Sequence, residues 1–111
     1  MTNELPSSVR VVEVGPRDGL QNESGPVSTE QKVAFIDRLT DAGCTHIEVT
    51  SFVSPRWVPA LSDHDTVFRR IRKKPGVTYS VLVPNRLGME RACDAGVKHV
   101  AIFTAASESF T

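Results

Sequence analysis

Residues 9–23, with the sequence VRVVEVGPRDGLQNE, decide how the rest of this chain is interpreted. Valines dominate the first half and Gly15-Pro16 closes it, which predicts a β-strand over residues 9–14. A polar loop carrying Arg17 and Asp18 follows at once. Because parallel α/β folds place their chemistry beyond the carboxyl ends of strands, we expect a functional site here. The alternative is an exposed Arg17–Asp18 ion pair, which would contribute little.

The remainder of the chain alternates helix and strand patterns. Ser28 with Gln31 forms a capping-box pattern, and Gly43 supplies a left-handed helix stop. Asn85 is positioned to cap a later helix. The pattern predicts helices over residues 29–42, 64–74 and 86–95, and strands over residues 46–50, 77–83 and 98–104. Together with the strand at 9–14, this alternation indicates an α/β fold with parallel strands: the first half, about four βα units, of a (β/α)8 TIM barrel.

Two local features refine this prediction. The motif Asp-Ala-Gly at residues 41–43 recurs at 94–96, which aligns two strand beginnings and places His46 and His99 at equivalent positions. We interpret both histidines as structural, although Asp-Ala-Gly is also a common way to leave a helix. The loop over residues 51–63 is longer than most connections in such folds, which favours a functional role. His64 follows this loop, and we expect it to be exposed.

The composition bounds the class of protein. The chain has 111 residues, 40% hydrophobic and 23% charged, and its 13 Lys plus Arg balance 13 Asp plus Glu. This is typical of one globular domain, with no charge excess that would favour nucleic acid or a membrane surface as partner. No transmembrane or secretory pattern occurs, so we expect a cytoplasmic protein. Cys44 and Cys93 lack metal-site spacing, and we expect both to be buried and unpaired.

Two phrases carry a family resemblance. The stretch GPRDGLQNE at residues 15–23, together with IEVTSFVSPRWVP at 47–59, resembles hydroxymethylglutaryl-CoA lyases over about residues 9–111. The shorter pattern R-D-G-x-Q occurs more widely, in metal-dependent barrel enzymes that make or break carbon–carbon bonds. The resemblance implies a flexible segment at residues 1–8 and the N-terminal half of a TIM-barrel catalytic domain at 9–111. Since a half barrel leaves open sheet edges, we expect a homo-oligomer.

The resemblance also implies a reaction and roles for named residues. The reaction cleaves 3-hydroxy-3-methylglutaryl-CoA, an acyl-CoA substrate, to acetyl-CoA and acetoacetate with a divalent metal, Mg²⁺ or Mn²⁺. Asp18 matches the family's carboxylate metal ligand, and Arg17 matches the catalytic arginine that neutralises the enolate oxygen. Glu48 matches a catalytic acidic residue that orients Arg17 or assists proton transfer; a purely structural ion pair is the alternative. Gln21 and Ser51 are candidate substrate-binding residues, or ordinary loop hydrogen-bonding groups.

Other parts of the family pattern are absent from these residues. The resemblance places the remaining metal ligands, an H-x-H pair and an asparagine, and the catalytic cysteine in its glycine-rich loop in the second half of the barrel. No H-x-H occurs here, and Cys44 and Cys93 do not stand in the family's cysteine context. We therefore expect the remaining ligands to lie outside this chain and the chain alone to be inactive. Two alternatives remain open: part of an acyl-CoA-dependent synthase of the isopropylmalate or homocitrate type, and a non-catalytic half-barrel.

Overall fold

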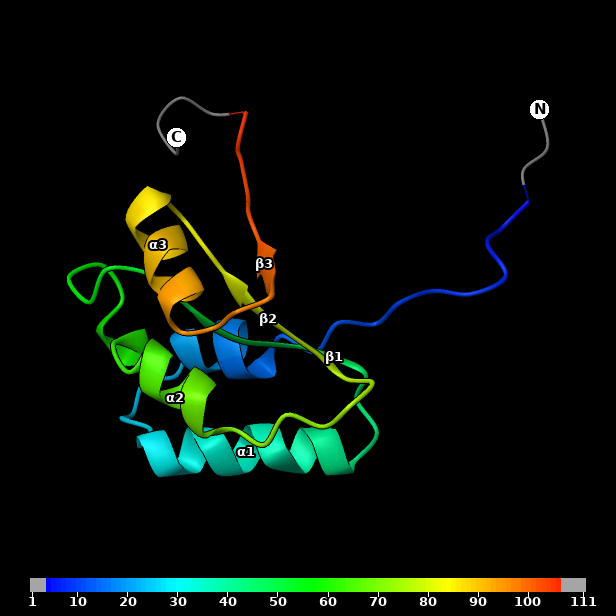
Figure 1. Cartoon of the computed structure of the whole chain (residues 1–111), viewed down its shortest axis with the longest axis horizontal. Helices are drawn as coiled ribbons and strands as arrows, with labels where there is room; N and C mark the ends of the chain where they lie inside the picture. The colour runs from blue at the N-terminus through cyan, green and yellow to red at the C-terminus, as the bar shows by residue number, and fades with distance from the viewer. Residues whose placement is uncertain (1–3, 107–111) are drawn as a thin grey trace.

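The computed structural model describes residues 4–106, which form a three-stranded parallel sheet with helices between the strands (Figure 1). The strand order is β1-β2-β3. Since crossovers between parallel strands are right-handed, α2 and α3 cover the same face of the sheet. This confirms the predicted α/β class. The helices are α1 (Thr29–Asp41), α2 (His64–Arg70) and α3 (Arg86–Asp94), and the strands are β1 (His46–Ser51), β2 (Thr78–Leu82) and β3 (His99–Ala101). 

The hydrophobic core lies between the helices and one face of the sheet. Tyr79 and Val81 alternate with the less buried Ser80 and Leu82 along β2, so the first pair faces the helices. Burying such side chains supplies the main stabilising free energy of the fold. The residues of this core are Ile36, Ile47, Val49, Phe52, Val67, Phe68, Ile71, Tyr79, Val81, Val83 and Ala92. The opposite face, which carries Ser80 and Leu82, is left free to form a site.

The predicted helix caps are present. The Ser28 hydroxyl accepts a hydrogen bond from the Gln31 backbone N–H at 3.1 Å, and the Gln31 side chain accepts from the Ser28 N–H at 2.9 Å. The Asn85 side chain accepts from the Gly88 N–H at 2.8 Å. Gly43 takes a left-handed φ of 101° after α1. Because these contacts join residues that are close in sequence, the starts of α1 and α3 and the end of α1 could be predicted from the sequence.

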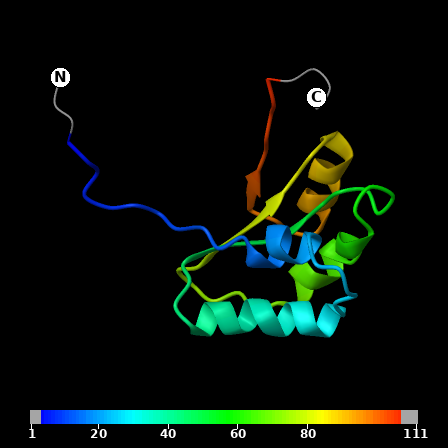
Figure 2. The ribbon, with the colours of Figure 1, turned by 180° about the vertical axis from the view of Figure 1, so that it is seen from behind.

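The prediction of a β-strand over residues 9–14 is wrong, because these residues form a single bridge and no continuous strand. Within residues 4–106, only Glu13 of this segment pairs, in a parallel bridge with Ile47. Its N–H donates to the His46 carbonyl and its carbonyl accepts from the Glu48 N–H, each at 2.9 Å. Val9 remains 81% exposed and Val11 73%. The segment leaves the sheet in both views (Figures 1 and 2) because no described segment runs alongside it. Residues 1–3 of the expected flexible segment 1–8 lie outside the described residues.

Two further differences concern element ends, and a third concerns the exposure of a cysteine. Helix α2 ends at Arg70 instead of residue 74, because Ile71 is extended (ψ 148°) and the Arg72 N–H donates to an Asp37 carboxylate oxygen on α1 at 2.9 Å. A tertiary hydrogen bond thus replaces a helical one. Strand β3 is shorter than the predicted 98–104. Cys93 is exposed rather than buried, because Gly88 and Ala92 form the buried side of α3.

In residues 4–106, no helix combines the length and apolar character that crossing a membrane requires.

Candidate active site

A cavity of about 360 Å³ lies at the carboxyl ends of the strands and brings three of the predicted site residues together. Arg17, Gln21 and Ser51 contribute its polar part. Arg17 comes from the short helical turn η1 (Gly15–Gly19), which follows the Glu13 bridge, and Ser51 ends β1. The other lining residues are Val53, Val58, Leu82, Pro84 and Phe103. Segments that follow successive strands therefore converge on one site, at the carboxyl ends of the strands where we expected it.

Arg17 is held by two carboxylates. Its Nε donates to Glu48 Oε1 at 2.5 Å, and its Nη1 lies 3.3 Å from Asp18 Oδ1. The Arg17 and Glu48 side chains are only 20% and 10% exposed. A pair so far from solvent has a fixed geometry, in contrast to a surface ion pair. Glu48 therefore orients the positive charge of Arg17 at the polar end of the cavity.

A register shift in β1 places Ser51 on the same side as Glu48. Glu48 pairs with Ser80, Thr50 with Val81 and Ser51 with Leu82, so β1 advances two residues where β2 advances one. Regular alternation would put residues 48 and 51 on opposite faces. The extra residue in β1 reverses this, as a β-bulge does. Both Ser51 and its neighbour Leu82 consequently line the cavity.

Ser51 and Gln21 differ in their freedom to contact a substrate. Ser51 is 3% exposed, and its hydroxyl donates to the Leu82 carbonyl at 3.1 Å, so only its oxygen lone pairs remain available to a ligand. The Gln21 side chain is exposed and forms no hydrogen bond with the described residues. Gln21 thus offers both donor and acceptor groups at the cavity.

Two of the predicted site residues, Glu48 and Asp18, do not line this cavity. Glu48 acts on it through its contact with Arg17, whereas Asp18 lies nearer the surface. Its side chain is 55% exposed, and its described partner is Arg17. Mg²⁺ and Mn²⁺ prefer about six oxygen-rich ligands in octahedral geometry. Across residues 4–106, no group of three or more His, Cys, Asp or Glu side chains is placed to hold a metal ion. Asp18 therefore fits the role of one oxygen ligand, and the described chain does not complete a coordination shell.

Sequence reasoning missed the apolar wall of the cavity. Val53 and Val58 lie in the long loop after β1, Leu82 ends β2, and Phe103 follows β3. The unusual length of the loop was the available signal, since it supplies two of these side chains. An apolar wall facing Arg17 suits a ligand that is charged at one end and carries alkyl groups at the other.

His64 is buried, contrary to the sequence expectation. Its ring centroid lies 4.4 Å from that of Phe52, and its Nδ1 is buried with no hydrogen-bond partner among the described residues. Burial lowers the pKa of His64, Arg91 lowers it further, and Asp65 and Asp63 partly oppose the shift. The ring supports Phe52, which directly follows Ser51. His64 is thus part of the support behind the site.

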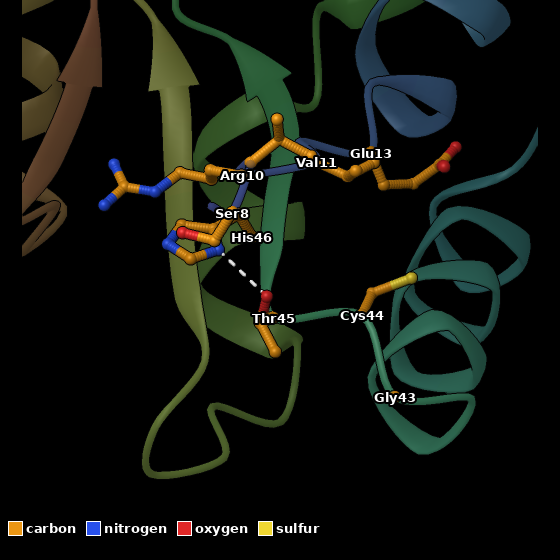
Figure 3. Close-up of a pocket in the computed structure, with 9 residues that line it drawn as sticks. Ser8, Arg10, Val11, Glu13, Gly43, Cys44, Thr45 and His46 are labelled. Atoms are coloured by element: carbon orange, nitrogen blue, oxygen red, sulfur yellow. Dashed lines mark hydrogen bonds between the residues drawn. The ribbon is translucent and has the colours of Figure 1, made fainter. Parts of the chain in front are cut away.

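A different cavity, of about 550 Å³, lies at the amino end of β1 (Figure 3). Arg10, Glu13, Cys44 and His46 are among its lining residues, and none of the predicted site residues is. His46 Nδ1 lies 3.0 Å from Thr45 Oγ1, the contact drawn dashed in Figure 3. In parallel α/β folds this end of the strands carries stability and the other end carries chemistry. The Arg17 cavity is therefore the candidate active site.

The fold and the Arg17 cavity define a protein of the (β/α)8-barrel type, with its site at the carboxyl ends of parallel strands. The chain belongs to the HMGL-like family, whose model matches residues 8–111. It is 59% identical over 107 residues to the mitochondrial hydroxymethylglutaryl-CoA lyase of Macaca fascicularis, an alignment that covers 96% of this chain and 33% of the relative. The chain thus spans about a third of the length of this relative.

Solved structures support the same family assignment. The hydroxymethylglutaryl-CoA lyase of Pseudomonas aeruginosa superposes with a TM-score of 0.88 at 56% identity, covering 96% of this chain and 35% of that one. A lyase of the same kind from Acinetobacter baumannii, in complex with coenzyme A and 3-methylmalate, superposes with a TM-score of 0.87 at 39% identity, covering 90% and 33%. The predicted family and fold are confirmed.

Proposed function

We propose that this chain supplies part of the active site of a hydroxymethylglutaryl-CoA lyase, which cleaves 3-hydroxy-3-methylglutaryl-CoA into acetyl-CoA and acetoacetate. The observation that carries this proposal is the convergence of Arg17, Gln21 and Ser51 on one cavity, with Glu48 fixing Arg17 at 2.5 Å. The lyases that this chain resembles support the choice of reaction. The relative that binds coenzyme A supports an acyl-CoA as the substrate.

Arg17 meets the main electrostatic demand of this reaction. Loss of the proton from the tertiary hydroxyl lets the carbon–carbon bond break, and the hydroxyl oxygen becomes the ketone oxygen of acetoacetate. The electron pair of the broken bond moves into the thioester, which leaves as the enolate of acetyl-CoA. A cation already fixed near the enolate oxygen stabilises this charge without reorganising. We assign this role to Arg17, and to Glu48 the role of holding Arg17, because the Glu48 carboxylate already accepts the Arg17 Nε–H.

The remaining cavity residues would orient the substrate. Gln21 would bond a polar oxygen of the acyl group, and Ser51 would accept a hydrogen bond from a substrate hydroxyl, since its own proton is committed to Leu82. The apolar wall would contact the methyl group. Mg²⁺ or Mn²⁺, bound by Asp18 together with ligands outside the described residues, would polarise substrate oxygens.

Assembly as a homo-oligomer and a cytoplasmic location remain proposals. Light scattering would test the first and cell fractionation the second.

A chimera tests this function directly. Residues 8–111 would replace the matching segment of the Pseudomonas aeruginosa lyase, and cleavage of 3-hydroxy-3-methylglutaryl-CoA would be followed with Mg²⁺ or Mn²⁺ present. We expect the chimera to turn over and its R17M variant to lose about 100-fold or more in kcat, as enzymes do when a key electrostatic group is removed. The 111-residue chain alone should show no turnover.

Two results would overturn the proposal. One is a folded chimera without lyase activity beside an active parent enzyme. The other is a chimera that instead condenses acetyl-CoA with a 2-oxo acid, which would indicate a synthase.

A further inference from the structure

A separate cavity, of about 250 Å³, lies at the amino ends of β2 and β3 and is strongly basic. The turn before β2 contributes Lys73 and Lys74, and the start of β3 contributes Lys98 and His99. The sequence contains four lysines, and three of them line this one cavity. Among residues 4–106, no aspartate or glutamate lines it. In a chain with no net charge, this is a local concentration of positive charge.

The lysines of this cavity have no counter-charge in the described part of the chain. The fourth lysine, Lys32, is paired with Asp63 at 2.6 Å. Within residues 4–106, by contrast, Lys73, Lys74 and Lys98 form no ion pair. Lys73 Nζ has neutral partners: it donates to the Phe68 carbonyl at 2.5 Å and lies 4.4 Å from the Phe68 ring centroid. Its positive charge is therefore held in place but not neutralised.

The carboxylate that acts on Lys73 electrostatically, Asp37, already has another partner. It accepts a hydrogen bond from the Arg72 N–H at 2.9 Å and does not line the cavity. Burial lowers the pKa of Lys73, which is consistent with a cation that gains from an incoming anion.

The segment between α2 and β2, which carries Lys73 and Lys74, is anchored by hydrogen bonds. The Lys74 N–H donates to the Tyr79 hydroxyl at 3.0 Å, and that hydroxyl lies 3.0 Å from Thr40 Oγ1 on α1. The Val77 N–H donates to the Lys74 carbonyl at 3.2 Å, across Gly76 in the left-handed region (φ 86°). The basic groups are thus presented by a defined scaffold, which lowers the entropic cost of binding.

We propose that this cavity binds a phosphate-bearing small anion. Lysine ammonium groups act as point charges for phosphate oxygens, and the cavity volume accommodates a phosphate or diphosphate group. The site is separate from the Arg17 cavity, because the two lie at opposite ends of strands of about five residues, roughly 17 Å at 3.3 Å per residue. This inference does not depend on the proposed lyase function.

Calorimetric titration of the 111-residue chain with inorganic pyrophosphate tests the proposal. We expect saturable binding at one site, and a Kd raised about tenfold in K74Q/K98Q. Neither side chain forms a hydrogen bond with another described residue, so this variant should fold. The matched control is R38Q, which removes an exposed charge on α1 and should leave Kd unchanged. K73R, which keeps the charge, should also bind.

Four outcomes would overturn the proposal, three from the titrations above and one from the variant R17M. The first is no saturable binding at low ionic strength. The second is an equal Kd for wild type and K74Q/K98Q. The third is an equal weakening by R38Q, which would show only diffuse attraction of anions. The variant R17M separates the two sites: loss of pyrophosphate binding in R17M would place the anion in the Arg17 cavity and contradict a distinct site.

Discussion

Arg17 Nε donates to Glu48 Oε1 at 2.5 Å across 31 residues of sequence, which joins the turn η1 to strand β1. Both side chains are largely buried, so this contact fixes the turn and its guanidinium together. A loop beyond a strand is ordinarily mobile on its own. Here the buried carboxylate makes it part of the rigid sheet.

Replacing Glu48 with glutamine should therefore weaken both the fold and the site. The amide keeps the shape but removes the negative charge beside Arg17, so we expect the free energy of unfolding to fall by about 1–3 kcal/mol. Urea denaturation of the 111-residue chain measures this. In the chimeric lyase, kcat should fall about 100-fold through misplacement of Arg17. The control E90Q breaks an exposed pair of 3.7 Å with Arg86 and should cost under about 0.5 kcal/mol. Equal effects would contradict the role of Glu48.

The Lys32–Asp63 pair should also be essential for stability. Asp63 accepts hydrogen bonds from Lys32 Nζ at 2.6 Å and from Thr29 Oγ1 at 2.5 Å, and Lys32 is 5% exposed. D63N leaves a buried ammonium group without its counter-charge, for which we expect a loss of about 3 kcal/mol. D41N, which breaks an exposed pair with Arg72, should lose less than about 1 kcal/mol. Similar urea midpoints for the two variants would refute this.

His64 should make stability depend on pH. Burial lowers its pKa in the folded protein below the ordinary 6.5, which the unfolded chain retains. The unfolded chain therefore takes up the proton first, so the stabilisation is complete above pH 6.5 and declines as the pH falls below it.

Urea midpoints at pH 7.5 and 5.5 test this effect. Wild type should lose stability between the two, and H64L should lose clearly less. The control H99Q, at an exposed histidine, should keep the wild-type slope. An H64L slope equal to that of wild type would show that His64 is not responsible.

Gly88 should tolerate no side chain. A Cβ at this position would overlap the backbone carbonyl oxygen of Phe52, the residue after Ser51. We expect G88A to destabilise the protein by about 1–3 kcal/mol, since a rigid backbone atom must move. G25A is the matched control because no atom of the described residues lies within 4 Å of a Cβ there. Thermal melts compare the two, and a G88A melt as high as that of G25A would show that the contact is relieved without cost.

The sequence by itself determined the features that depend on neighbouring residues. The capping box at Ser28, the Asn85 cap and the glycine stop at Gly43 all use groups within a few positions of each other, so their hydrogen bonds follow from spacing. The alternation of these elements was sufficient for the α/β class. The order of residues along the chain likewise indicated that polar side chains, such as Arg17 and Asp18, follow an apolar segment.

Tertiary structure alone decided the features that join distant residues. The register shift between Glu48 and Thr50 depends on pairing with β2, and it puts Ser51 beside Leu82. The burial of His64 depends on Phe52, and residues 9–12 fail to form a strand because no described segment pairs with them. Pairing and burial are set by partners far along the chain, which local spacing does not encode.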